Sequence, residues 1–172
     1  QMVRVVRKTE KGAKQAILHY QTLRSLPDGS AVCKVQLETG RSHQIRVQFA
    51  SRGCALLGDA RYGTGGRQLC LWAYQLTLIH PTKQERMVFT APAPKQIEGK
   101  PTGGVMVFAK TSKAAARLSK QLQQHRMQKT YLLRCVRPPK PLDGTMEDFL
   151  LKGSDQMVRV VRKTEKGAKQ AI

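Results

Sequence analysis

The sequence is short of acidic residues. It has 11 Asp and Glu against 31 Lys and Arg, which leaves a formal net charge of +20. That excess favours a polyanionic partner, with nucleic acid as the first candidate, because neutralising phosphates releases condensed counterions. A merely soluble basic protein is the alternative. The chain also lacks a long apolar run and a clear basic amphipathic helix, so no membrane partner is predicted.

Aromatic residues and paired cysteines are scarce as well. Aromatics make up 5% of the chain, so aliphatic residues must supply most of the core. The four cysteines, Cys33, Cys54, Cys70 and Cys135, form no CxxC pair, and their wide spacing predicts no zinc or other metal site. No signal peptide is visible. We therefore expect reduced thiols and a cytoplasmic protein.

The two ends of the chain are identical. Residues 1–17 and 156–172 both read QMVRVVRKTEKGAKQAI. A single partial copy at this separation is no solenoid, and we interpret it as an artefact of how the chain was assembled, like a ring cut open with overlap. Two copies of one strand cannot fill one place in a sheet. We predict that one copy packs natively, while the other pairs elsewhere, swaps into a neighbouring molecule or stays disordered.

Hydrophobic periodicity predicts strands that outnumber helices. Alternation around the turn 26–30 predicts a hairpin, and hairpin signals dominate over βαβ units. The expected strands are Ala16–Leu23, Ala31–Leu37, Leu69–Ile79, Arg86–Thr90, Val105–Ala109 as a central strand, Gln128–Val136 and Val158–Val161. The expected helices run from a Ser42 cap to about Arg52, and from a Thr111 or Ser112 cap to about His125. This pattern predicts an α+β fold with a mixed, mainly antiparallel sheet and flanking helices.

Four sequence strings in the chain indicate a protein family more specifically than the composition does. They are Leu37-Glu-Thr-Gly-Arg-Ser-His-Gln-Ile-Arg-Val47, Leu57-Gly-Asp-Ala-Arg-Tyr-Gly63, Pro101-Thr-Gly-Gly-Val-Met-Val-Phe-Ala-Lys-Thr111 and Lys129-Thr-Tyr-Leu132. Together the strings resemble the RluA-type RNA pseudouridine synthases. The resemblance implies a mixed sheet with a cleft across it, an RNA substrate, isomerisation of uridine to pseudouridine after base flipping, and no metal or organic cofactor.

The strings stand in a different order from that of the family. Within one predicted domain spanning residues 1–172, residues 1–94 resemble the family's C-terminal half and 101–155 its middle. Residues 95–100 read as a join between them, and 156–172 duplicate the start. We predict a monomer, with strand swapping through the duplicated end as the exception.

The family's catalytic aspartate is missing. In the family it directly precedes the Pro-Thr-Gly-Gly string, and here that position falls on Gly99. Glu98 lies one residue away, but an active site positioned to within about 1 Å does not tolerate such a shift. We therefore expect that the segment before Pro101 has been lost.

Two further residues match the family's active site. Tyr131 lies 32 positions after Gly99, the family's interval from catalyst to active-site tyrosine, which implies a ring that stacks on the flipped uracil. An ordinary strand tyrosine is the alternative. Arg46 matches the arginine that pairs with the catalytic aspartate. Without that partner we expect it to contact phosphate, another anion or solvent, and a solvated helix arginine is the alternative.

Several neighbours of these residues have less certain roles. Arg41 and His43 either order their loop or bind phosphate, and Lys129 is a candidate RNA contact beside Tyr131. Leu57 matches a position that lines the family's pocket, but a core leucine fits equally well. Asp59 resembles a structural acid of the family.

Three functions remain open from the sequence: a pseudouridine synthase, a basic RNA-binding module without catalysis, and a permuted, incomplete fragment.

Overall fold

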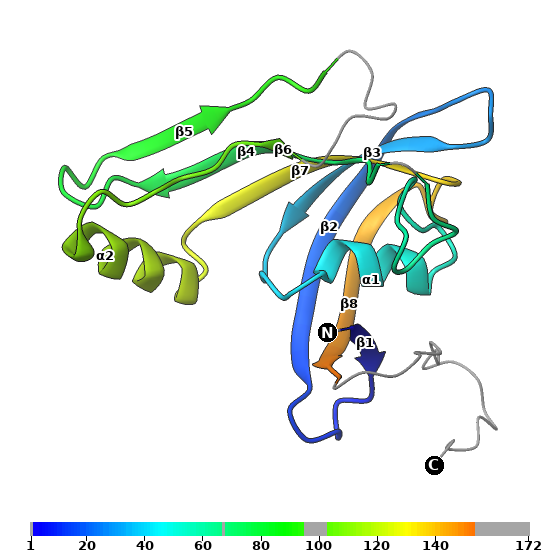
Figure 1. Ribbon diagram of the computed structural model, residues 1–172, viewed down its shortest axis with the longest axis horizontal. Coiled ribbons are helices and arrows are strands. Elements are labelled where there is room, and N and C mark those ends of the chain that lie inside the picture. The colour runs from blue at the N-terminus through cyan, green and yellow to red at the C-terminus, as the bar shows by residue number, and fades with distance from the viewer. Residues whose placement is uncertain (1, 67, 95–102, 154–172) are drawn as a thin grey trace.

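The computed structural model describes residues 2–66, 68–94 and 103–153 (Figure 1). In chain order the elements are β1 (Val3–Val6), β2 (Lys14–Ser25), β3 (Ala31–Leu37), α1 (Gln44–Ser51), β4 (Leu71–Ile79), β5 (Arg86–Thr90), β6 (Gly103–Gly104), α2 (Ser112–Gln123), β7 (Gln128–Cys135) and β8 (Asp143–Lys152). The strands of these described residues form one sheet in the order β1-β8-β2-β3-β7-β4-β5, with β6 beside β4. Every pairing except β4–β6 is antiparallel, which confirms the predicted fold class.

The hairpin of β2 and β3 forms as predicted. Its turn closes through a hydrogen bond from the backbone N–H of Leu26 to the carbonyl of Ser30. The Asp28 carboxylate accepts hydrogen bonds from both the backbone N–H and the hydroxyl of Ser30, the local capping typical of aspartate in turns. Gly29 supplies the left-handed backbone, with φ of 82°.

Both helices lie on the same face of the sheet (Figure 1). Ile45 and Phe49 of α1 pack against buried side chains of the central strands, including Leu18, Val35 and Leu133. Each such burial stabilises the fold by roughly 1.5–3 kcal/mol relative to an exposed side chain.

Polar contacts fix α1 to the strands beneath it. The buried Gln48 amide donates to the carbonyls of Ala16 in β2 and Met146 in β8 and to the Asp148 carboxylate. Arg52 pairs with the same Asp148 at 2.8 Å. The helix is therefore held at a defined position above β2 and β8.

Helix α2 is attached more loosely. Thr111 caps it as predicted, its hydroxyl accepting from the Ala114 N–H. No residue of α2 is fully buried. Leu118 packs against a small cluster of Leu76, Leu78 and Met127.

Two details of the predicted elements are wrong, and strand β8 was not predicted. The stretch Val105–Ala109 is not a central strand, because only Gly103 and Gly104 pair with β4 before the segment leaves the sheet. β5 occupies that edge of β4 from Gln75 onward and leaves no room for a longer partner. Helix α1 is also not capped by Ser42: its N-cap is His43, in a left-handed conformation with φ of 53°.

The first copy of the repeated end forms β1 and the start of β2, on opposite sides of β8. The second copy, with the predicted strand at Val158–Val161, lies outside the described residues, as do Glu98 and Gly99. Within the described ranges, no helix is long and apolar enough to cross a membrane.

Candidate functional site

A buried glutamine organises the loop that leads into α1. The Gln44 carbonyl oxygen accepts hydrogen bonds from the Thr39 hydroxyl and the Arg41 backbone N–H, both at 2.9 Å. Its amide donates to the carbonyl of Ile17 in β2 at 3.0 Å. Arg41 adds a second tie, because its Nε donates to the carbonyl of Gln15 at 2.9 Å. These contacts agree with a role for Arg41 in ordering the loop, one of the two roles that the sequence left open, and its binding of phosphate stays a prediction.

His43, at the start of α1, belongs to a short hydrogen-bond chain. Its Nδ1 lies 2.8 Å from the Tyr62 hydroxyl, which also accepts a hydrogen bond from the Val3 backbone N–H. The hydroxyl retains its own proton to donate to Nδ1, as expected for a neutral imidazole. Burial, together with the nearby Arg46 and Arg61, lowers the pKa of His43, which agrees with the neutral form.

Arg46 is held by a carboxylate within the chain. Its Nε and Nη2 donate to the two oxygens of Asp59 at 2.8 Å and 2.7 Å, a bidentate pair. The Asp59 side chain is fully buried and also accepts from the backbone N–H groups of Arg61 and Tyr62. Burial alone would raise the pKa of Asp59, but these hydrogen bonds outweigh it and hold the pKa below its usual value.

This pair corrects the expectation that Arg46 is left without a partner. Asp59 takes the place that the sequence assigned to phosphate, another anion or solvent. The guanidinium also lies over the Tyr62 ring, 5.0 Å from its centroid. The sequence missed both partners, although the string Leu57-Gly-Asp-Ala-Arg-Tyr-Gly63 contains them. Asp59 has the interactions expected of a structural acid, since it fixes a loop and an arginine.

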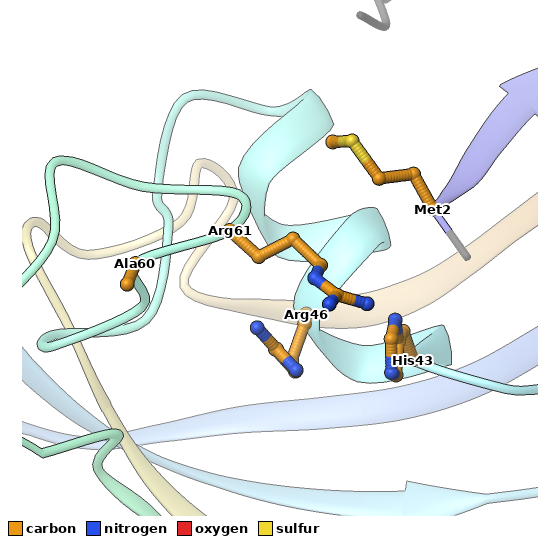
Figure 2. A pocket seen from close by; sticks show the side chains of 5 residues that line it. All are labelled: Met2, His43, Arg46, Ala60 and Arg61. Carbon is orange, nitrogen blue, oxygen red and sulfur yellow. The ribbon is translucent and has the colours of Figure 1, made fainter. Parts of the chain in front are cut away.

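Beside this pair lies an open cavity of about 610 Å³ (Figure 2). Met2, His43, Arg46, Ala60 and Arg61 line it. Figure 2 shows the nitrogen-bearing ends of His43, Arg46 and Arg61 gathered beside α1, with Met2 across from them at the end of β1. Asp59 takes one N–H each from Nε and Nη2 of Arg46, so the other donors of this guanidinium remain, and Arg61 brings a second guanidinium. The hollow therefore suits an anion such as a phosphate.

The remaining predicted residues do not line this cavity. Tyr131 is a half-buried residue of β7, opposite Val35, and packs against the main core; burial raises the pKa of its hydroxyl. Leu57 is half-buried, and its backbone N–H donates to the Arg134 carbonyl at 2.8 Å.

Lys129 shares a face of β7 with Tyr131, because the two are separated by one residue. Its Nζ lies against Gly40, where an added Cβ would come within 2.6 Å of it. Burial lowers the pKa of Lys129. Lys129 therefore connects β7 to the loop before α1. It shares its face of the sheet with Tyr131, which packs against the core that includes residues of α1.

Among the described residues, no group of three or more His, Cys, Asp or Glu side chains could hold a metal ion.

Comparisons with known proteins find the same family that the sequence strings resemble. A family model described as RNA pseudouridylate synthase matches residues 1–51 and 99–172, and the chain belongs to this family. It is 35% identical over 96 residues to the uncharacterized RNA pseudouridine synthase YhcT of Bacillus subtilis, covering 54% of this chain and 32% of that protein. It is 37% identical over 83 residues to the dual-specificity RNA pseudouridine synthase RluA of Haemophilus influenzae, covering 45% and 38%. These likenesses support an RluA-type member.

The chain spans about a third of the length of the curated relatives that it matches. No solved structure matches it significantly.

Proposed function

We propose that this chain contributes the uridine-binding part of an RluA-type pseudouridine synthase, which isomerises uridine in structured RNA. One observation carries the proposal: Arg46 is fixed by the fully buried Asp59 beside a cavity that also presents His43 and Arg61. A guanidinium held by two hydrogen bonds keeps its remaining N–H donors in a fixed direction. Those donors are then ready for an RNA phosphate without further ordering.

The reaction breaks the bond between N1 of uracil and C1′ of ribose and forms a bond between C5 and C1′. C5 loses a proton and N1 gains one, so the change is an isomerisation without oxidation or reduction. The base must leave the RNA helix to be reached. We also propose that the Tyr131 ring stacks on the flipped uracil, as the resemblance to the family implies.

The missing catalyst favours a second candidate, a binding module without turnover. Asp59 is committed to Arg46 and to two backbone N–H groups and is fully buried, so it cannot act on a ribose or a base. The family's catalytic position, Gly99, carries no carboxylate. On this reading the chain binds RNA but needs an acid from elsewhere to react.

Release of tritium from RNA that contains 5-tritiated uridine separates the candidates. Turnover above background that is lost in Arg46→Gln supports the enzyme. Salt-dependent RNA affinity without turnover supports the module, and the absence of both contradicts an RNA function. Arg4→Gln is the matched control, because Arg4 lies in β1, does not line the cavity and forms an exposed ion pair with Glu10.

The finer assignments are part of the proposal. We propose ribosomal or transfer RNA as the substrate, a cytoplasmic location and a monomeric protein. A relative from Zymomonas mobilis, 33% identical over 97 residues, is named ribosomal large subunit pseudouridine synthase D, which supports the ribosomal alternative.

A further inference from the structure

The segment between β6 and α2 exposes large apolar side chains. Met106 is 76% exposed and Phe108 is 79% exposed, and Val107 between them is 44% exposed. Single apolar residues are common on protein surfaces, but a run of three that includes a phenylalanine is a candidate contact surface for another molecule.

This exposed run lies in an acid-free part of the chain. From residue 103 to residue 142 there is no Asp or Glu. The same stretch holds nine basic residues: Lys110, Lys113, Arg117, Lys120, Arg126, Lys129, Arg134, Arg137 and Lys140. A protein partner covering Phe108 would have to bring its own acids, whereas RNA brings one phosphate with every planar base.

The attachment of α2 leaves one of its flanks basic. The Gln121 side chain clamps the end of β4, accepting from the Ile79 N–H at 2.9 Å and donating to the Ile79 carbonyl at 2.7 Å. Arg117 donates to the Pro81 carbonyl. Lys113 and Lys120 lie one helical turn to either side of Arg117 and are both exposed. Lys110 is exposed just before the helix, two residues after Phe108.

We propose that Met106, Phe108, Lys110, Lys113 and Lys120 form a second RNA-binding surface, which takes an unpaired segment of the RNA. Phe108 stacks on a base and Met106 covers its edge, while the three lysines bind the flanking phosphates. None of these residues lines the cavity at Arg46. The inference rests on the proposed function for the nature of the polyanion, but it does not depend on catalysis.

Binding of a fluorescent single-stranded oligouridine, followed by anisotropy, tests this surface. Phe108→Ala should weaken the affinity about tenfold, the usual effect of losing one stacked base. Phe108→Trp should retain it, and its indole fluorescence should be quenched on binding. The double variant Lys113→Ala, Lys120→Ala should weaken binding and reduce the slope of log affinity against log salt by about one to two.

Leu142→Ala is the control for Phe108, because Leu142 is a 54% exposed apolar residue with no predicted role, and it should leave affinity unchanged. Equal affinity of Phe108→Ala and the unsubstituted chain overturns the inference. So does a concentration-dependent dimer that Phe108→Ala abolishes without a change in RNA affinity. If the unsubstituted chain binds no RNA, the proposed function fails together with the inference. If it binds RNA and Phe108→Ala binds equally well, only the inference fails.

Discussion

At the scale of single residues, the pair of Arg46 and Asp59 carries the site. A bidentate ion pair around a fully buried carboxylate is costly to break, because the remaining partner keeps its desolvation cost without its counter-charge. The folded-state pKa of Asp59 is depressed. Its contribution to stability is therefore complete above the unfolded pKa of about 3.9 and is lost as pH falls through the folded value.

Replacing Asp59 by asparagine should destabilise the fold by about 3 kcal/mol, because Arg46 loses its buried counter-charge. Urea unfolding at pH 7 measures this loss. The control is Glu10→Gln in the exposed Arg4–Glu10 pair, where we expect less than about 1 kcal/mol. Equal losses in the two variants would contradict a special role for the buried pair.

His43 gives the site a dependence on pH. Its pKa is lowered in the folded protein, so the unfolded chain takes up a proton at a higher pH than the folded chain does. Stability from this residue is complete above the ordinary value of about 6.5 and falls as pH decreases from there through the folded pKa.

In His43→Asn this part of the pH dependence should disappear, because asparagine does not titrate and tolerates the left-handed backbone at this position. Unfolding free energies between pH 5 and pH 8 measure the difference between the two proteins. Parallel curves would contradict the assignment.

At the scale of elements, the sequence predicted what local patterns determine. Alternation over 31–37 and the turn around Asp28 and Gly29 were enough for the β2–β3 hairpin, and strand β5 was predicted residue for residue. The apolar run 105–109 gave a wrong prediction of a central strand, because periodicity cannot show that β5 already occupies the edge of β4. β1 has the same four letters as the predicted strand Val158–Val161. Strand β8 was not predicted, because it is stabilised by β1 and β2 across long sequence separations, which no local window contains.

The same distinction applies to the site. Arg41 and His43 could be identified from one sequence motif, and both form hydrogen bonds that order their loop. The Arg46–Asp59 pair joins two strings, so its existence depended on how the chain folds between them.

Helix α2 should be less protected from hydrogen exchange than helix α1. It has no fully buried residue and depends on Leu118 and on the clamp of Gln121, whereas α1 buries Ile45, Val47 and Phe49. Gln121→Ala should speed exchange in α2 further and leave α1 unchanged. Slower exchange in α2 than in α1 would contradict the loose attachment of α2 to the sheet.

The duplicated end makes its own prediction about exchange. β1 of the first copy pairs with residues 149–152 of β8, and β8 has β2 on its other side. Only one copy can therefore occupy this place, and the two copies should differ in their protection from exchange. Mass spectrometry of peptides that distinguish residues 1–17 from 156–172 by their flanking sequence measures this, and equal protection of both copies would contradict it.

At the scale of the whole molecule, charge and family membership point to the same partner. The repeated 17 residues hold five basic residues and one acid, so the unique part of the chain still carries a charge of 20 − 4 = +16. The cavity at Arg46 and the acid-free stretch from β6 to β8 both add to this field. RNA affinity should accordingly fall steeply with salt.

The central claim is that Arg46, held in place by Asp59, binds an RNA phosphate at the cavity that His43 and Arg61 also line. The affinity of Arg46→Gln for a structured RNA, measured over a series of salt concentrations beside the control Arg4→Gln, tests it most directly. We predict that Arg46→Gln weakens binding and lowers the slope of log affinity against log salt by about one, while Arg4→Gln changes neither. An affinity and a slope in Arg46→Gln equal to those of the unsubstituted chain would contradict the claim.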